Sequence, residues 1–330
     1  MEQTPVLSIC IASKDRPAAL VDQVERLSRQ TSDRPVEIVV VESSTTGRFS
    51  AADEKGARVH RTEKPNGVDF DYDMSMRLAS GDYCWLFTDD DLADADAVER
   101  ILAYLSAHPS VDVLLLDGRV RGTAGEPLAG SMTAGPIDPA ETPVTGDSVA
   151  AFFAKHSQLL TFIGAVVIRR STWVDHDVTQ YFGTEFVHVG VILERPLAQV
   201  AILATPALTV KYGVAHWEVR ALRVWTLQWP RLVKMVVPQK DWPSYFPATF
   251  PHRVARLIEF RARRTLAFNN RRAAFPEAPA WERAGFAVVT LLPVKLALYI
   301  TRARFARAGS DTTIFEYDVQ RSRDRGKATT

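Results

Sequence analysis

The first 42 residues alternate two short apolar runs with an amphipathic segment, and this pattern constrains the fold more than any other feature. Val6–Ala12 reads VLSICIA and Val36–Glu42 reads VEIVVVE, and continuous apolar runs of this length are typical of strands buried on both faces. From Pro17 onward, the residues between them carry apolar side chains at helical spacing. A strand, a helix and a strand in this order predict a parallel strand pair with a right-handed crossover.

The same alternation continues along the chain. Further strands are expected at 58–61, 83–88, 111–116, 162–168 and 199–203, and helices around 70–78 and 98–105. Residues 118–147 are rich in Gly and Pro, which predicts a loop or irregular hairpin, and from about Trp217 the pattern becomes helical. The sequence therefore predicts an α/β domain over residues 1–215, with a mixed, mostly parallel sheet flanked by helices, and a helical extension over residues 216–330.

Composition and charge narrow the class of protein. The chain has 330 residues, of which 46% are hydrophobic and 24% charged, as in ordinary globular proteins. Its 40 basic and 39 acidic residues give a net charge of +1, which argues against nucleic acid as a partner. Residues 251–330 contain 16 basic and 7 acidic residues, or +9, so the first 250 residues carry −8. The basic segment is either a solvated helical surface or one attracted to an anionic surface such as a membrane.

The location of the protein is inferred from its cysteines and from its N-terminus. Cys10 and Cys84 both lie in apolar runs and are expected to be buried and reduced. No signal peptide is visible, so we expect a cytoplasmic protein. The longest apolar run, 284–300, is interrupted by Pro293 and Lys295 and is short for a membrane-spanning helix, but it could lie on a bilayer.

Three consecutive carboxylates, Asp89 to Asp91, directly follow the predicted strand 83–88. Ligands of open α/β sheets bind beyond the carboxyl ends of the strands. Adjacent carboxylates repel one another, and a divalent cation such as Mg²⁺ or Mn²⁺ would offset this repulsion while binding substrate phosphates. The alternative is a solvated helix N-terminus, where Asp is also favoured.

A second polar segment, Glu42 to Thr46, follows the second strand and reads ESSTT. An acid beside hydroxyl groups suits hydrogen bonding to a ribose or a base, although an ordinary polar turn has the same composition. The chain contains neither a glycine-rich dinucleotide fingerprint after the first strand nor a phosphate-binding P-loop, which argues against oxidoreductases and P-loop kinases.

Taken together, these segments resemble the nucleotide-sugar-binding elements of glycosyltransferase family 2, whose members have the GT-A fold. The resemblance rests on ASKDR at 12–16, ESSTT at 42–46, ASGD at 79–82 and TDD at 88–90. It implies a nucleoside-diphosphate-sugar donor bound by Ala12, Ser13, Arg16, Glu42, Asp82 and Asp89. It also implies Mn²⁺ or Mg²⁺ held by Asp90 and Asp91 with His216; Thr88 occupies the first position of the usual Asp-x-Asp motif.

A narrower resemblance is to the abequosyltransferase-like group, through residues 81–91, 183–190 and 211–217. The resemblance to family 2 implies that Glu185, expected at the start of a helix, is the general base. His188, three residues later, would share a helical face with Glu185 and could tune the base or act as the base itself. The alternatives are a surface Glu185, a core His188 and a packing role for His216.

The implied function is an inverting, metal-dependent transfer of a sugar to a saccharide acceptor. That acceptor would be linked to a polyprenyl diphosphate, in O-antigen-like surface polysaccharide assembly at the inner face of the cell membrane. Residues 217–310, rich in Trp and Arg, would contact the membrane or would only pack as a helical subdomain. The other candidates are a sugar nucleotidyltransferase, disfavoured because residues 12–17 lack Gly, a non-catalytic nucleotide-sugar sensor or scaffold, and a membrane-docking protein.

Overall fold

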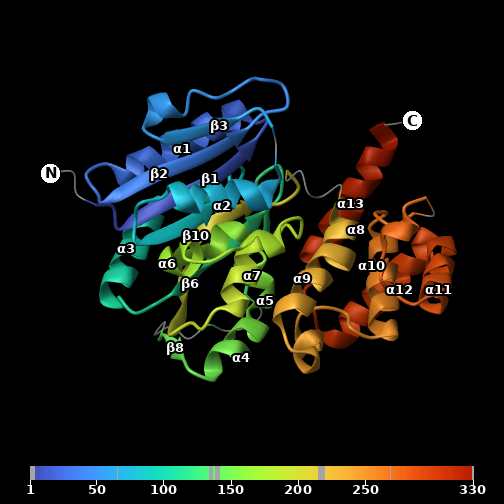
Figure 1. Cartoon of the computed structure of the whole chain (residues 1–330). Coiled ribbons are helices and arrows are strands. Elements are labelled where there is room, and N and C mark those ends of the chain that lie inside the picture. The colour runs from blue at the N-terminus through green and yellow to red at the C-terminus, as the bar shows by residue number, and fades with distance from the viewer. Residues whose placement is uncertain are drawn as a thin grey trace. The chain divides into compact units, whose positions relative to one another are not determined.

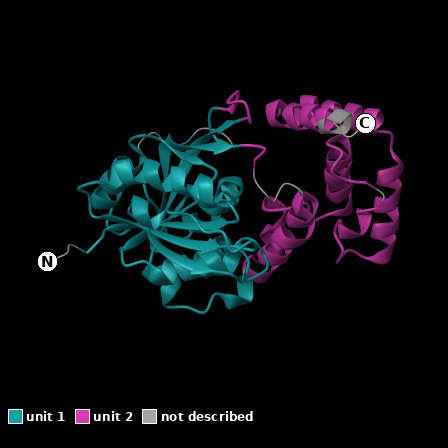
Figure 2. Ribbon diagram, turned by 90° about the horizontal axis from the view of Figure 1, so that it is seen from above, with its two compact units in different colours: residues 1–121, 130–211 teal, residues 122–129, 212–330 magenta. Residues whose placement is uncertain are grey.

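The computed structural model describes residues 4–64, 66–133, 137, 142–214, 220–267 and 269–328 (Figure 1). The chain divides into two compact units (Figure 2). Unit 1 comprises residues 1–121 and 130–211, and unit 2 comprises residues 122–129 and 212–330. The predicted domain boundary falls at residues 215–219, which lie outside the described ranges.

Unit 1 is built on one mixed sheet with the strand order β3-β2-β1-β4-β9-β6-β10-β5, and β8 pairs with β10. The neighbours among β1 to β4 are parallel, as are β6 and β10, whereas β9 runs antiparallel between β4 and β6. The predicted mostly parallel α/β sheet is confirmed. The strands are β1 Leu7–Lys14, β2 Val36–Ser43, β3 Arg58–Thr62, β4 Tyr83–Phe87, β5 Leu92–Ala93, β6 Val113–Arg121, β8 Val144–Thr145, β9 Val166–Arg169 and β10 Gln199–Lys211.

Helices flank this sheet, and the apolar runs of its central strands are buried between them. In α1, Pro17 occupies the first turn, where its missing N–H costs nothing, and Leu20, Val24 and Leu27 form the buried face. The helices of unit 1 are α1 Pro17–Thr31, α2 Val68–Leu78, α3 Ala97–Ala107, α4 Ser148–Lys155, α5 Ser157–Leu160, α6 Ser171–Val174 and α7 Val187–Glu194.

Two strands are longer than the sequence predicts. β6 continues to Arg121, into the segment predicted as a loop, and β10 continues to Lys211 instead of ending at 203. The two strands pair in two stretches, with a register shift between Leu203 and Leu208. The irregularity accommodates Pro206, whose missing N–H would interrupt a regular ladder. The strand predicted at 162–168 is shorter, because a 3₁₀ turn occupies Ile163–Ala165.

Unit 2 is helical, as predicted for the C-terminal extension, with the short strand β7 Pro127–Ala129 as an exception. α8 Ala221–Arg223 passes through a π-helical turn, Val224–Gln228, into α9 Trp229–Val236. The later helices are α10 Phe250–Ala262, α11 Ala280–Leu291, α12 Val294–Ala308 and α13 Thr313–Ala328. Their apolar core includes Leu257, Phe260, Phe275 and Phe286, with a second cluster around Leu298 and Phe315.

Candidate functional site

The candidate site lies at the carboxyl edge of the parallel strands of unit 1. Because β1, β2 and β4 run in the same direction, Ser13, Glu42 and Asp89 all come to this edge. α2 leads from the end of β3 back to the start of β4, so its N-terminus lies at the same edge. It packs on β1 and β2. The side chains near the start of α2 therefore face the ends of these strands.

Arg16 connects two of the three predicted carboxylates. Its Nη1 lies 2.7 Å from Asp89 Oδ1 and 3.0 Å from Asp90 Oδ2. Ser13 Oγ donates to the other oxygen of Asp89 at 2.6 Å. The guanidinium thus offsets part of the repulsion between the carboxylates, a role that sequence analysis gave to a metal ion alone.

Asp91 differs from its two neighbours because it is buried. Its Oδ1 accepts the backbone N–H of Lys211 at 3.2 Å, and its own N–H donates to Thr88 Oγ1 at 3.1 Å. Burial, with the nearby charge of Asp90, raises the pKa of Asp91 to about 7. Asp91 is therefore partly protonated at neutral pH. Thr88, in turn, stabilises the turn after β4 through its hydroxyl.

Glu42 is buried and holds the loop that follows its own strand. Its carboxylate accepts the backbone N–H of Ser50 at 2.7 Å and Ser50 Oγ at 2.9 Å. Arg61 Nε lies 3.6 Å from Glu42 Oε2.

Asp15 connects the loop after β1 to the loop after β2. Asp15 has a φ of 54°, and its carboxylate accepts both the N–H and the hydroxyl of Thr45 at 2.7 Å, which lowers the pKa of Asp15. The loops after β1 and β2 are thereby joined.

Asp82 does not join this site. It directly precedes β4 and is exposed, next to Tyr83, whose N–H donates to the carbonyl of Val6 before β1. It therefore lies at the amino edge of the sheet, one strand length from Asp89. The structure does not support the expectation that Asp82 lies with the other donor-binding residues, because Asp82 precedes β4 and Asp89 follows it. Ala12, in contrast, is half-buried in β1 immediately before Ser13.

Glu185 is held at the carboxyl edge by Asp69 of α2. Asp69 Oδ2 accepts the backbone N–H groups of Gly183 and Glu185, both at 2.9 Å, and its Oδ1 accepts that of Val187 at 3.0 Å. Glu185 has a φ of 66°, in the left-handed region, and its side chain is half-buried. Burial raises the pKa of Asp69, while the three N–H groups oppose that rise.

Two further side chains near the start of α2 contact the ends of strands. Ser43 Oγ, at the end of β2, donates to Asp71 at 2.8 Å. The hydroxyl of Tyr72 donates to the carbonyl of Phe87, the last residue of β4, at 2.8 Å. Burial raises the pKa of Asp71 to about 6. The first half of α2 thus brings together the Glu185 segment and the ends of β2 and β4.

Sequence analysis missed Asp69 and Asp71. The helical spacing of Phe70, Met74 and Leu78 predicts this helix, yet these three side chains are only half-buried, whereas the two aspartates are buried. The sequence did contain a signal for them: α2 carries an acidic residue at every second position. Acidic side chains at this spacing point in several directions from a helix, so some of them must face the protein.

His188 is buried inside unit 1 and contacts α5. His188 is 1% exposed, and its Nε2 lies 3.1 Å from the carbonyl oxygen of Leu160. Burial lowers the pKa of His188 to about 4. The expectation that His188 and Glu185 share a helical face is wrong, because α7 begins at Val187 and Glu185 lies before it. His216 lies outside the described residues.

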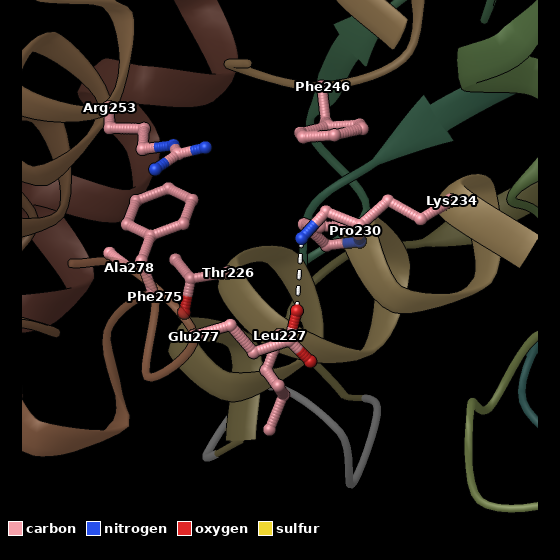
Figure 3. A pocket seen from close by; sticks show the side chains of 9 residues that line it. All are labelled: Thr226, Leu227, Pro230, Lys234, Phe246, Arg253, Phe275, Glu277 and Ala278. Atoms are coloured by element: carbon pink, nitrogen blue, oxygen red, sulfur yellow. Dashed lines mark hydrogen bonds and ion pairs between the residues drawn. The ribbon is translucent and has the colours of Figure 1, made fainter. Parts of the chain in front are cut away.

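A separate small pocket lies in unit 2 and contains none of the predicted site residues (Figure 3). Lys234 Nζ pairs with Glu277 at 2.9 Å, and the guanidinium of Arg253 lies over the ring of Phe275 and pairs with Glu282. Both cations therefore already have acidic partners. The lining residues are Thr226, Leu227, Pro230, Lys234, Phe246, Arg253, Phe275, Glu277 and Ala278.

Comparisons with known proteins agree with this fold. Residues 8–139 match the family model described as Glycosyl transferase family 2. The crystal structure of S. aureus TarS 1-349 is similar, with a TM-score of 0.51, 13% identity, and coverage of 86% of this chain and 90% of that one. The mannosyltransferase PcManGT from Pyrobaculum calidifontis, solved in complex with GDP-Man and Mn²⁺, has a TM-score of 0.48 and 13% identity, covering 96% of this chain and 86% of that one. No curated protein sequence matches. Residues 8–139 are thus similar to Glycosyl transferase family 2, and the chain shares a mixed α/β fold of GT-A type with a solved structure.

Proposed function

We propose that this protein is an inverting glycosyltransferase that moves a sugar from a nucleoside diphosphate to a hydroxyl of a saccharide acceptor. The observation that carries this proposal is the contact between Asp69 and the segment 183–187. It holds Glu185 at the sheet edge where Asp89 and Asp90 follow β4. A single displacement at a sugar carbon requires a base for the attacking hydroxyl and a site that neutralises the negative charge of the leaving diphosphate, both at one edge of the sheet.

In the proposed reaction, Glu185 accepts the proton of the acceptor hydroxyl while that oxygen forms a bond to the anomeric carbon. The bond from that carbon to the diphosphate oxygen breaks, and its electron pair leaves with the nucleoside diphosphate. Attack from the face opposite the leaving group inverts the anomeric configuration. Arg16, beside Asp89 and Asp90, is placed to pair with the departing diphosphate.

Asp90 and Asp91 also fit a divalent cation of the kind that binds together with a nucleoside-diphosphate sugar. The described residues contain no group of three or more His, Cys, Asp or Glu arranged as a metal cage. Mg²⁺ and Mn²⁺ bound with substrate phosphates need only one or two carboxylates, because waters and phosphate oxygens supply the other ligands. Asp90 is 16% exposed, and Arg16 contacts one of its oxygens. Asp90, with Asp91 beside it, would hold the cation, which when bound would neutralise charge on the diphosphate.

The test compares Glu185→Gln and Asp90→Asn in a transfer assay with nucleoside-diphosphate sugars and Mn²⁺. Thermal-shift screening with UDP, CDP, GDP and dTDP sugars identifies the donor first. Both variants should lose at least about 100-fold in rate. Glu185→Gln should keep the nucleotide-induced thermal shift, because it removes only the base.

Asp82→Asn is the matched control, since this exposed aspartate lies at the other edge of the sheet. It should retain the wild-type rate. Wild-type rates in both Glu185→Gln and Asp90→Asn, with folding unchanged, would show that the proposed mechanism is wrong.

The acceptor and the location follow from the resemblance to the abequosyltransferase-like group. We propose a polyprenyl-diphosphate-linked saccharide of an O-antigen-like surface polysaccharide, extended with a hexose or deoxyhexose at the inner face of the cell membrane. Incorporation of labelled sugar into material that partitions into organic solvent tests this acceptor class directly.

A further inference from the structure

Large apolar side chains gather at the surface of α11 and α12. Leu291 and Tyr299 are 70% and 72% exposed, and they belong to a group of five that we call the apolar corner: Trp281, Val288, Leu291, Leu296 and Tyr299. In the described part of the chain, only Val68 and Met235 are large hydrophobic side chains of comparable exposure elsewhere. Large apolar side chains exposed in such number on two consecutive helices indicate an interaction site.

The two helices are apolar on the outside as well as on the inside. On α11, Phe286 and Val289 point into the core of unit 2. Trp281 and Val288 lie on the opposite face, because a spacing of seven residues returns to the same side of a helix. A water-exposed helix normally carries polar residues at these outer positions. The outer face of α11 therefore matches an apolar environment better than water.

The helix pair has the composition of a membrane segment but not its shape. Among the described residues, no single helix is long and apolar enough to cross a bilayer; α11 and α12 satisfy these criteria only as a pair, and their axes bend by 108° at the break (Figure 1). Leu291 and Leu296 flank this bend around Pro293. A sharply bent pair that is apolar at its corner is suited to entering one leaflet from one side.

The two helices that carry the apolar corner also carry an excess of basic residues. Residues 280–308 contain five basic residues, Arg283, Lys295, Arg302, Arg304 and Arg307, and one acid, Glu282, which is buried against Arg253. Arg283, Lys295 and Arg307 are exposed and form no ion pair with any residue that the structure describes. Trp, Tyr and Leu bordered by free cations favour the headgroup region of an anionic bilayer.

We propose that the apolar corner docks into the surface of a bilayer that contains anionic lipids. The apolar side chains would lie at the boundary of headgroups and acyl chains, and the surrounding cations would pair with lipid phosphates. This inference builds on the proposed location at a membrane. The test of this inference measures lipid binding alone. A negative result would therefore not contradict the proposed transfer reaction, and a failed transfer assay would not contradict lipid binding.

The experiment floats the full-length protein with vesicles of phosphatidylcholine mixed with phosphatidylglycerol, and with phosphatidylcholine alone. The wild type should float with the anionic vesicles. The double variant Leu291→Glu/Tyr299→Glu should lose at least about tenfold in vesicle partitioning, because two charges would enter the apolar boundary. Both positions are mostly exposed, so the variant leaves the core intact, as its thermal unfolding should verify.

Met235→Glu is the matched control, because Met235 is 43% exposed on α9 in the same unit. It should float like the wild type. Lys295→Glu should weaken binding to the anionic vesicles only. Absence of wild-type flotation, or equal flotation of the double variant, would overturn the proposal. The proposal would also be overturned if the wild type were a dimer and the double variant a monomer, because a second copy of the chain would then cover the apolar corner.

Discussion

Asp69 in the first turn of α2 accepts the backbone N–H of Glu185, 116 residues further along the chain, at 2.9 Å. The same carboxylate accepts the N–H groups on either side, of Gly183 and Val187. One buried side chain therefore fixes the backbone of the proposed base.

Asp69→Asn should lower the rate of transfer and leave donor binding unchanged. An amide offers one acceptor oxygen in place of two, so its N–H₂ group would face at least one of the three N–H groups. We expect a loss of about 2 kcal/mol in the free energy of unfolding and a fall in kcat at constant donor KM. Urea unfolding and steady-state kinetics measure the two effects.

Asp73→Asn is the control for this prediction, because Asp73 lies on the same helix and binds Trp173 Nε1 at 2.8 Å, away from Glu185. It should cost stability but little kcat. An equal fall in kcat for the two variants would mean that Asp69 acts only through the stability of α2.

Glu185→Gly should make the protein more stable and inactive. A non-glycine residue at a φ of 66° is strained, and glycine relieves this strain, so the free energy of unfolding should rise by about 1 kcal/mol. Asp33, exposed at a φ of 60°, provides the matched comparison. Asp33→Gly should be stabilised similarly and remain fully active; activity in Glu185→Gly would exclude Glu185 as the base.

Arg16→Gln should increase the response of the protein to Mn²⁺ in the absence of nucleotide. In the wild type the guanidinium already neutralises Asp89 and Asp90, and a cation at Asp90 must compete with it. Thermal-shift titration with Mn²⁺ should therefore give a larger rise in Tm for Arg16→Gln than for the wild type. Arg26→Gln, which removes an exposed ion pair with Asp22 on the same helix, should behave like the wild type. Equal shifts for all three proteins would argue against a cation at Asp90.

His188 should make the protein less stable in acid. Burial lowers its pKa from 6.5 to about 4, so between these values the unfolded chain binds a proton that the folded protein does not. This contribution to stability is present above pH 6.5 and is lost as the pH falls towards 4. Between pH 7 and pH 5 the loss is about 2 kcal/mol.

Urea unfolding of the wild type and of His188→Gln at these two pH values checks this prediction. The other titrating groups are common to both proteins, so the difference between their pH dependences isolates His188. Identical pH dependences would mean that His188 is protonated as easily in the folded protein as in the unfolded chain.

The parts of the fold that the sequence predicts are those with local causes. The apolar runs of β1, β2 and β4 and the aspartates after β4 are visible within a few residues. The contacts of Asp69 and Asp71 connect distant segments, and no local pattern identifies their partners. The end of β10 was missed for a similar reason, because Pro206 reads as a strand breaker until its pairing with β6 is known.

Three residues of α2, Asp69, Asp71 and Asp73, link three different parts of unit 1: the segment around Glu185, the end of β2, and Trp173 of α6. The spacing of these attachments is set by the helical rise, about 1.5 Å per residue, and not by the lengths of the connecting loops. Residues inserted in the exposed stretches 46–48 or 175–177 would therefore bulge into solvent while the anchored backbone stayed in register. An insertion in either loop should therefore leave the spacing of these three attachments unchanged.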